Sequence, residues 1–184
     1  MRIVAGAFRG RRLAPLAGRG TRPSSDRLRE AMFAALADVR DADVLDLFAG
    51  TGALGLEALS RGAASCCFCE TAPAALATLR ANVASLGVED RCTIVSRPAE
   101  WLLAGHRARD TRYDLVLVDP PYAILPDVTA LLDASLHPIV PAGGRLVLES
   151  AAGSEPECAG FVVSSRRRIG AASLTILTRE ADPS

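Results

Sequence analysis

A glycine-rich segment follows a short apolar run in the first third of the chain. Residues 44–47 (Val-Leu-Asp-Leu) lead directly into Phe-Ala-Gly-Thr-Gly-Ala-Leu-Gly, in which Gly50, Gly52 and Gly55 have the spacing G-x-G-x-x-G. Where a strand turns through such glycines into a helix, backbone N–H groups can closely approach a nucleotide-like ligand. We therefore predict that a nucleotide-like cofactor lies across the end of this strand.

Two carboxylates indicate which cofactor this is. Asp46 lies four residues before Gly50, where it would repel a pyrophosphate but would suit a ligand with ammonium and sulfonium charges. Glu70 lies 20 residues after Gly50 and can accept hydrogen bonds from both hydroxyls of a ribose. Both features fit S-adenosylmethionine (SAM); in the alternative, Asp46 only orders the loop and Glu70 caps a turn. The residues expected to bind SAM here are Asp46, Ala49, Gly50, Thr51, Gly52 and Glu70.

A second motif, Asp119-Pro-Pro-Tyr122, ends another apolar run. If the substrate is the exocyclic amine of a nucleobase, Asp119 can accept one amine N–H and a carbonyl of Pro120 or Pro121 the other. The prolines restrict the turn, so the acceptors stay aimed and leave the amine lone pair facing the methyl group. Tyr122 can stack on a base that is splayed from its neighbours. We predict methyl transfer to a nucleobase amine without a metal ion, with Asp119, Pro120, Pro121 and Tyr122 as the catalytic residues.

Both motifs require strands that end at the same edge of a sheet. The chain alternates apolar strands with helices, which is typical of a parallel sheet buried on both faces. Two final strands without a helix between them predict an antiparallel hairpin and a reversed edge strand. The expected fold class is α/β, the Rossmann-like, mostly parallel doubly wound sheet of a class I SAM-dependent methyltransferase. The expected strands are 44–47, 65–69, 93–95, 113–118, 145–148, 160–168 and 173–179, and the expected helices are 26–37, 54–60, 73–86, 99–105 and 127–136.

Charge is distributed unevenly along the chain, although its net charge is zero. Residues 1–30 hold eight arginines against two acids, and the remainder is acidic by the same margin. A basic arm on an acidic body is the pattern expected where one part meets a polyanion, and a solvated tail is the alternative. We expect residues 1–23 to form a basic β-hairpin arm and residues 24–184 to form the catalytic domain.

The chain is similar over nearly its whole length, from Arg2 to about Arg179, to the RsmD family of bacterial small-subunit ribosomal RNA guanine-N2 methyltransferases. The opening Arg-Ile-Val-Ala-Gly-Ala-Phe-Arg-Gly-Arg-Arg-Leu resembles the hairpin of that family, and residues 21–33 resemble its T-R-P-T-x-D-R-x-R-E-x-x-F stretch. Residues 47–63 and 119–122 complete the resemblance. These two central motifs occur in many amino-methyltransferases, whereas the N-terminal stretches narrow the match to one family.

This resemblance implies methyl transfer from SAM to N2 of one guanine in small-subunit ribosomal RNA, with S-adenosylhomocysteine as the second product. The substrate would be an assembling or assembled 30S subunit, and we expect a cytoplasmic monomer that binds no membrane. Two other functions stay open: a DNA or RNA adenine-N6 methyltransferase that uses the same motif, and a non-catalytic ribosome-assembly factor. The arginines expected to face RNA are Arg9, Arg11, Arg12, Arg19, Arg22, Arg27 and Arg29, with Arg22 and Arg27 the strongest candidates.

The sequence departs from the family near the expected adenine site. After the third strand many relatives carry Asp or Asn, whereas this chain has Ser-Arg-Pro-Ala. We therefore expect Ser96, or the backbone near Ala99, to recognise the adenine. Trp101 could flank the adenine, but we expect it to pack in the core.

Composition excludes several other classes of protein. A hydrophobic fraction of 49% with 23% charged residues excludes a disordered chain. No apolar run approaches the ~18–20 residues of a membrane helix. Cys66 and Cys69 have the C-x-x-C spacing of redox and zinc sites, but in a strand they point to opposite faces. We expect them to be small core residues, reduced in the cytosol.

Overall fold

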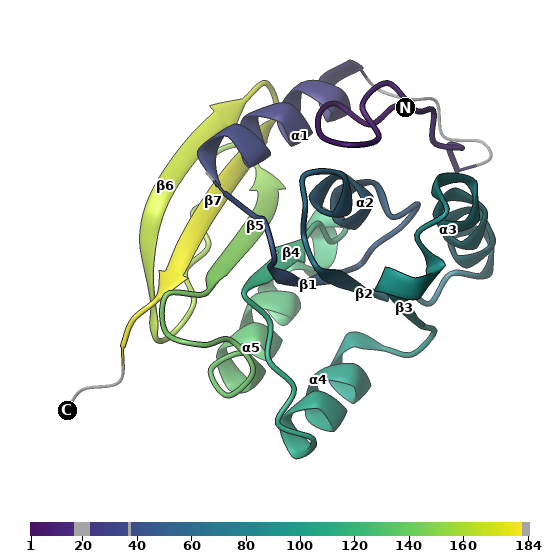
Figure 1. Cartoon of the computed structure of the whole chain (residues 1–184). Coiled ribbons are helices and arrows are strands. Elements are labelled where there is room, and N and C mark those ends of the chain that lie inside the picture. Colours follow the sequence, from purple (N-terminus) through teal and green to yellow (C-terminus); the bar gives the residue numbers. More distant parts are fainter. Residues whose placement is uncertain (17–22, 37, 182–184) are drawn as a thin grey trace.

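The computed structural model describes residues 1–16, 23–36 and 38–181 (Figure 1). In this part of the chain, a sheet of seven strands runs through the centre and helices cover both of its faces. The strands follow one another in the sheet in the order β3-β2-β1-β4-β5-β7-β6. Their bounds are β1 (Asp43–Leu47), β2 (Ser65–Cys69), β3 (Cys92–Val95), β4 (Leu115–Val118), β5 (Arg145–Ala151), β6 (Phe161–Ile169) and β7 (Ala172–Arg179).

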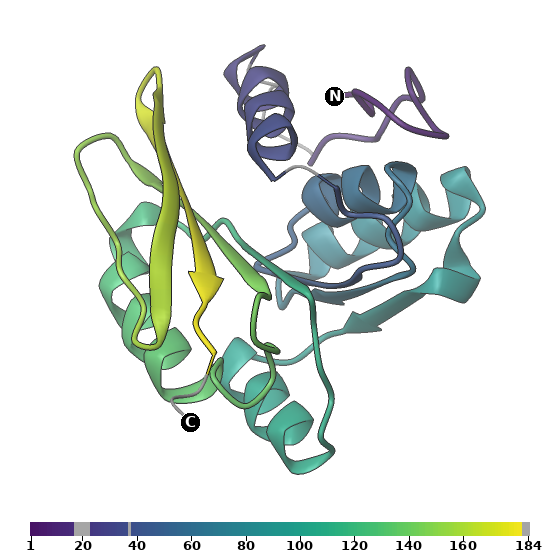
Figure 2. The ribbon, with the colours of Figure 1, turned by 60° about the vertical axis from the view of Figure 1, so that its left-hand side comes forward.

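Most strands of the sheet run in the same direction, so their carboxyl ends share one edge of the sheet. β1 pairs in parallel with β2 and β4, and the parallel pairing continues outward to β3 and β5. β7 is antiparallel to both β5 and β6, so β6 has the direction of β1 (Figure 2). The predicted antiparallel hairpin is present, but the prediction of a reversed edge strand is wrong. The reversed strand is β7, which lies inside the sheet because the hairpin folds its second strand onto β5.

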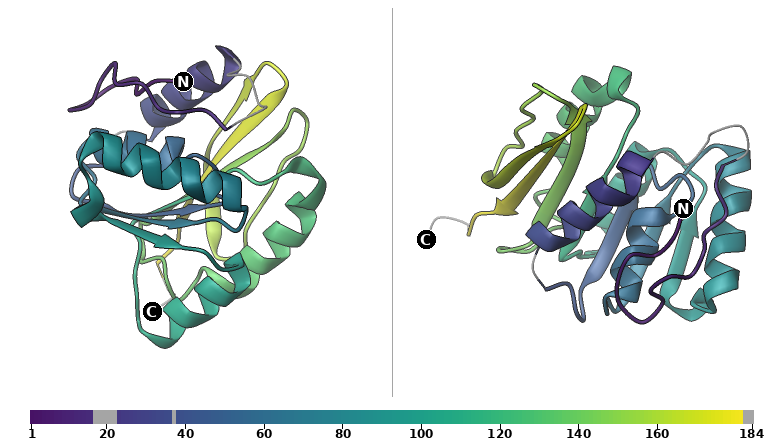
Figure 3. Two further views of the ribbon diagram at one scale, coloured as in Figure 1. Left: turned by 90° about the vertical axis from the view of Figure 1, so that its right-hand side faces the viewer. Right: turned by 90° about the horizontal axis from the view of Figure 1, so that it is seen from above.

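The helices form a layer on each face of the sheet (Figures 1 and 3). Because alternate side chains of a strand point to opposite faces, two separate hydrophobic clusters form. Val44 packs in the cluster under α1, α2 and α3, and Leu45 packs in the cluster under α4 and α5. The helices are α1 (Pro23–Ala35), α2 (Ala53–Ser60), α3 (Pro73–Leu86), α4 (Ala99–Ala108) and α5 (Leu125–Ser135), with 3-10 turns η1 (Glu89–Arg91) and η2 (Tyr122–Ile124).

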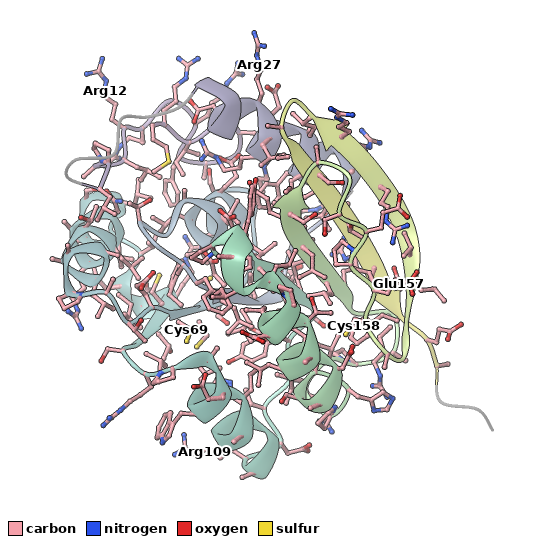
Figure 4. The ribbon with its side chains drawn as sticks, turned by 180° about the vertical axis from the view of Figure 1, so that it is seen from behind. Arg12, Arg27, Cys69, Arg109, Glu157 and Cys158 are labelled. Carbon is pink, nitrogen blue, oxygen red and sulfur yellow. The ribbon has the colours of Figure 1, made fainter. Side chains whose placement is uncertain are left out.

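The C-x-x-C cysteines lie in opposite layers, as their strand spacing predicts. Cys66 belongs to the cluster under α2, whereas Cys67 and Cys69 belong to the cluster under α4. All three are buried with free thiols, and Cys69 is labelled in Figure 4. Burial raises the pKa of Cys69 to about 12, so its reactive thiolate form is disfavoured. These cysteines are core residues.

The N-terminal arm doubles back with antiparallel backbone pairing, as a hairpin does, but it lacks the two strands that the sequence predicts. One isolated antiparallel bridge joins Arg2 to Arg12, and no strand is present in residues 1–16. The arm bends because it lies directly on α2. Gly6, with φ 82°, approaches this helix so closely that a Cβ atom there would lie 1.8 Å from the carbonyl oxygen of Ser60. A backbone pressed against a helix in this way cannot continue a strand ladder.

A buried carboxylate on α2 anchors the arm. Glu57 is 0% exposed and accepts hydrogen bonds from the backbone N–H groups of Val4 (2.8 Å) and Ala5 (3.0 Å). Its oxygens also lie 3.5 Å from the Arg29 guanidinium and 2.8 Å from that of Arg61. The buried carboxylate is thus surrounded by two guanidinium groups and two N–H donors, which offset the cost of burying a charged side chain.

Replacing Glu57 with alanine should lower the free energy of unfolding by about 3–5 kcal/mol, because buried Arg29 would lose one of its two carboxylate neighbours and the N–H groups of Val4 and Ala5 would lose their acceptor. Urea denaturation of the two proteins measures this difference. Glu155→Ala removes an ion pair whose carboxylate is 71% exposed, and should change stability by less than about 1 kcal/mol. Equal losses in the two variants would contradict the anchoring role of Glu57.

Candidate active site

The glycine loop connects the end of β1 to the start of α2. Gly50 and Gly52 have φ values of 54° and 80°, and Phe48, with φ 63°, takes the same left-handed conformation. A non-glycine residue in this region is strained, and such strain is common in functional loops. Gly55 serves packing instead, because a Cβ atom there would lie 2.4 Å from the ring of Phe68. Gly50 and Gly52 thus form the turn and Gly55 allows close packing on β2, whereas the approach of this loop to a cofactor stays a prediction.

Asp46 lies beneath this loop and is 1% exposed. Its Oδ2 atom accepts a hydrogen bond of 2.9 Å from the backbone N–H of Gly55, which ties β1 to the first turn of α2. Burial raises the pKa of Asp46 to about 7; the Gly55 bond opposes this shift, and the charges of Asp119 and Glu70 add to it. The loop-ordering role of Asp46 is therefore present in the structure, and its contact with a cofactor ammonium group stays a prediction.

Glu70, at the end of β2, also holds the loop. Its Oε2 atom accepts the N–H of Gly50 at 2.8 Å, and Oε1 accepts those of Thr71 (2.7 Å) and Ala72 (2.8 Å). Ala49 joins the same strand end, since its N–H donates to the carbonyl of Cys69. A carboxylate has about four acceptor positions, so three bonds leave room for a ribose hydroxyl. Glu70 does cap the turn, and its ribose contact stays a prediction.

Asn82 of α3 links the glycine loop to the N-terminal arm. Its side-chain nitrogen donates to the carbonyl of Thr51 at 2.9 Å, and its oxygen accepts the N–H of Ala14 at 2.7 Å. Asn82 is 1% exposed, so water does not compete for these bonds. One buried amide therefore positions both the expected cofactor loop and the arm, a connection that sequence spacing does not reveal.

β4 delivers the second motif to the same edge of the sheet. Leu47 pairs with Val118, so Asp119 follows at the level where the glycine loop begins. Pro120 is buried and Pro121 is exposed, and the prolines lead into η2, where Tyr122 is 45% exposed. Asp119 reaches the surface, yet the protein around its carboxyl raises its pKa. The two motifs, 67 residues apart between Gly52 and Asp119, form one site.

Glu149 of β5 is a member of this site that the sequence analysis missed. Its Oε1 atom accepts a hydrogen bond of 3.3 Å from the hydroxyl of Tyr122. Burial, together with the neighbouring charge of Asp119, raises the pKa of Glu149 to about 8. A signal was present in the sequence, since Glu149 follows an apolar strand just as Glu70 does.

The residues expected near an adenine lie where β3 leads into α4. Ser96 is exposed, and Ala99, which begins α4, is buried. Trp101 is 55% exposed, and the guanidinium of Arg97 lies 5.5 Å from its ring centroid. The expectation that Trp101 packs in the core is therefore wrong, because the next two residues take the buried face of α4. Adenine recognition by Ser96 or Ala99 stays a prediction.

The arginines expected to face RNA are not all at the surface. Arg29 is 2% exposed and donates to the backbone carbonyl of Arg2 at 2.6 Å, so the expectation that it faces RNA is wrong. Arg12 and Arg27 project from one end of the molecule, and Arg109 lies at the opposite end (Figure 4). The exposed members of the group are Arg9, Arg11, Arg12 and Arg27, whereas Arg19 and Arg22 lie outside the described residues.

The described residues form neither a metal-binding cluster nor a membrane-spanning helix. Among the described residues, no group of three or more His, Cys, Asp or Glu side chains could hold a metal ion. No helix in this part of the chain combines the length and apolar character needed to cross a bilayer. Two hollows, of about 310 and 490 Å³, are lined by residues that do not belong to the candidate site.

Known proteins are similar to this chain in sequence. The family model described as "Conserved hypothetical protein 95" matches residues 1–178. YlbH of Bacillus subtilis (strain 168) is 33% identical over 171 residues, which cover 91% of this chain and 92% of that protein. The ribosomal RNA small subunit methyltransferase D of Escherichia coli (strain K12) is 42% identical over 123 residues, which cover 66% of this chain and 60% of that protein.

Solved structures share the fold. The protein yhhF from Escherichia coli superposes with a TM-score of 0.83 and 34% identity, covering 99% of each chain. The hypothetical protein TTHA0928 of Thermus thermophilus gives a TM-score of 0.82 at 34% identity, covering 97% of this chain and 99% of that chain. SMU.776, solved in complex with SAH, is 15% identical with a TM-score of 0.69 and covers 86% of this chain and 50% of its own, so it shows the fold alone. The predicted fold class is confirmed.

Asp46→Asn should increase the free energy of unfolding at neutral pH. The folded-state pKa of about 7 exceeds the ordinary 3.8, so between these values the folded chain retains a proton that the unfolded chain loses. Wild-type stability therefore falls as the pH rises through this window, and asparagine, which can still accept the Gly55 bond, removes the loss. Urea unfolding should show a gain of ~1–3 kcal/mol near pH 8 and almost none near pH 4. An equal difference at both pH values would contradict the titration of Asp46.

Proposed function

The chain belongs to the RsmD family of ribosomal RNA methyltransferases, and on that premise we propose that it transfers a methyl group from SAM to the N2 amine of one guanine in small-subunit ribosomal RNA. The name of the Escherichia coli relative supports small-subunit RNA as the substrate. An assembling or assembled 30S subunit, the cytoplasm and a monomeric enzyme belong to the same proposal. The match extends over almost the whole chain, because residues 1–178 fit the family model.

One observation carries this proposal: the glycine loop after β1 and the Asp119–Tyr122 segment after β4 lie side by side. The parallel pairing of Leu47 with Val118 produces this placement. A methyl donor held at the loop would thus be next to an amine held at Asp119. Transfer between two bound groups depends mainly on such alignment and on fixed polar groups.

The chain's own residues then have separate tasks. The Asp119 carboxylate accepts one N–H of the target amine, and a carbonyl of Pro120 or Pro121 accepts the other. These bonds would orient the nitrogen lone pair towards the glycine loop, where bound SAM would supply the methyl group. The amine proton leaves after transfer, so no strong general base is required. Tyr122, at the surface, stacks on the splayed base.

The loop residues fit a positively charged adenosyl ligand. When bound, SAM supplies a methyl group activated by a sulfonium charge. Burial, together with the charges of Asp119 and Glu70, raises the pKa of Asp46, so a nearby ammonium group would stabilise its ionised form. Glu70 retains acceptor capacity for the ribose. Ser96 and the backbone at Ala99 are placed at the end of the adjacent strand β3, where they would meet the adenine.

Residues 1–23 would act as an RNA-facing arm on the catalytic domain of residues 24–184. The arm packs on α2 through Glu57 and on α3 through Asn82, which keeps its exposed arginines at a defined place on the surface. Guanidinium groups bind phosphates through paired N–H donors and are suited to this task. The RNA-facing role is proposed for Arg9, Arg11, Arg12, Arg22 and Arg27.

Methyl transfer from labelled SAM, followed by nucleoside mass spectrometry, tests this function. Unmodified small ribosomal subunits, the naked ribosomal RNA and duplex DNA serve as parallel substrates. We expect N2-methylguanosine in the subunits, in the RNA or in both. Methyladenine in the DNA or RNA would favour an adenine-N6 enzyme instead. Bound SAM without any transfer would favour a non-catalytic assembly factor.

Asp119→Ala should lower the rate of methyl transfer by at least ~10²–10³-fold, because the amine would lose its charged acceptor. SAM affinity, measured by calorimetry, should stay within a few-fold of the wild-type value. Asp90→Ala, which removes an exposed carboxylate on η1, is the matched control and should retain activity. If Asp119→Ala lost SAM binding to the same extent as activity, Asp119 would contact the cofactor and not the target amine.

The double variant Arg12→Ala/Arg27→Ala should bind ribosomal RNA more weakly and with a shallower salt dependence. Each lost phosphate contact should reduce the slope of log affinity against log salt by ~0.7–0.9, since fewer counterions are released. Filter binding at several salt concentrations measures the slope. Arg109→Ala removes an exposed arginine from the opposite end of the molecule and should leave the slope unchanged (Figure 4). If the double variant also keeps the wild-type slope, the RNA must bind elsewhere.

A further inference from the structure

Glu149 is held beside Asp119 by the pairing of β4 with β5. Val118 pairs in parallel with Leu148, and the next residue of each segment lies at the same edge of the sheet. On the other side of β5, the antiparallel strand β7 places Leu174 opposite Glu149. This arrangement gives Glu149 an apolar neighbour on one side and a second carboxyl group on the other.

The two carboxyl groups act as a pair. Asp119 and Glu149 directly follow a paired position of β4 and β5, and the Tyr122 hydroxyl donates to Oε1 of Glu149 at 3.3 Å. Burial and the charge of Asp119 raise the pKa of Glu149 to about 8, so a proton held on Glu149 near neutral pH can be shared with Asp119. Towards a third group, both carboxyls then offer acceptor lone pairs.

The bases that carry an exocyclic amine differ in the ring nitrogen beside it. In adenine and cytosine this ring nitrogen is a bare acceptor. In guanine it is the N1–H donor, so guanine presents two neighbouring kinds of N–H on one edge. An enzyme that binds a splayed base can read this edge with hydrogen bonds. Two neighbouring acceptors in the site can therefore both be satisfied by guanine. With adenine or cytosine, one of these acceptors would face the lone pair of the bare ring nitrogen, which is repulsive.

Resting on the proposed function, we propose that Glu149 determines the choice of guanine by accepting its N1–H while Asp119 accepts an N–H of its N2 amine. The shared proton keeps the two carboxyl groups together in this arrangement. Tyr122 helps to hold Glu149 in place through its hydroxyl. The pair also orients the base, because two bonds along one edge fix its rotation in the site.

Three variants test this role on unmodified small ribosomal subunits. Glu149→Ala should lower kcat/KM by ~10²-fold with unchanged SAM affinity, because one base contact and the proton on Asp119 are lost. Glu149→Gln should stay within ~10-fold of wild type near pH 7, since its amide can donate to Asp119 while its carbonyl accepts N1–H. Glu180→Gln, a change of the same kind at an exposed position on the far side of β7, should have no effect.

The pH dependence separates this role from a merely structural one. Wild-type kcat/KM should fall above about pH 8, because ionised Glu149 repels Asp119. The Glu149→Gln enzyme should lack this fall, because its amide proton does not titrate. Equal activity losses in the glutamine and alanine variants, or an unchanged fall in the glutamine variant, would overturn the proposal.

A base analogue tests the recognition itself. Subunits would be reconstituted with ribosomal RNA that carries 2-aminopurine at the mapped target guanine; this base keeps the N2 amine but has a bare N1. We expect wild type to methylate it at least ~10²-fold more slowly than guanine, and Glu149→Gln to reduce that difference to ~10-fold or less, because its amide can donate to N1. If the two enzymes discriminate equally, Glu149 does not read N1.

The two proposals fail differently in these assays. No methylated guanine in normal subunits with the wild-type enzyme would count against the proposed function, and the role of Glu149 would fall with it. Active wild type together with a fully active Glu149→Ala variant would overturn only the role of Glu149.

Discussion

Four carboxyl groups meet at one edge of the sheet, and their mutual repulsion is the constraint on which this site depends. Glu70 and Asp119 lie just beyond β2 and β4, and Asp46 and Glu149 lie in the second halves of the neighbouring strands β1 and β5. Burial and proximity raise the pKa values of Asp46 and Glu149 to about 7 and 8. Positive charge and further N–H donors would stabilise the ionised carboxyl groups at this edge, and a cationic cofactor and an amine-bearing base would supply them. Buried carboxyl groups that lie close together make the protein less stable without its ligands, and ligands that stabilise their charges would relieve this cost on binding.

The N-terminal arm depends on a second buried carboxylate with the opposite environment. Glu57 is surrounded by donors and cations, so it is a structural anchor rather than a reactive group. Glu57 and Asp46 are both almost fully buried, so the difference between their environments comes from their partners and not from exposure. Through Asn82, the arm also shares a hydrogen-bonding partner with the glycine loop at Thr51. The N-terminal arm and the glycine loop are therefore held by the same two helices, α2 and α3.

In the proposed arrangement, the residues that select the base lie next to the residues that serve methyl transfer. In the proposed function, the glycine loop and the Asp119–Tyr122 segment together serve methyl transfer to an exocyclic amine, but they do not fix which base carries that amine. A neighbouring acceptor that reads the ring nitrogen would narrow the choice to guanine without altering the transfer step. Glu149 has this position because β5 extends beyond the last residue of β4.

The sequence alone determined the alternation of strands and helices, the glycine loop with Asp46 and Glu70, and the Asp119–Tyr122 motif. Each of these is a local pattern, in which residues close in the chain satisfy one turn, one strand or one helix face. Only the tertiary structure decided that Arg29 is buried, that Trp101 is exposed, that β7 lies inside the sheet and that Glu149 adjoins Asp119. These features depend on contacts between segments far apart in the chain. Strand order and helix packing create such contacts, and local spacing does not encode them.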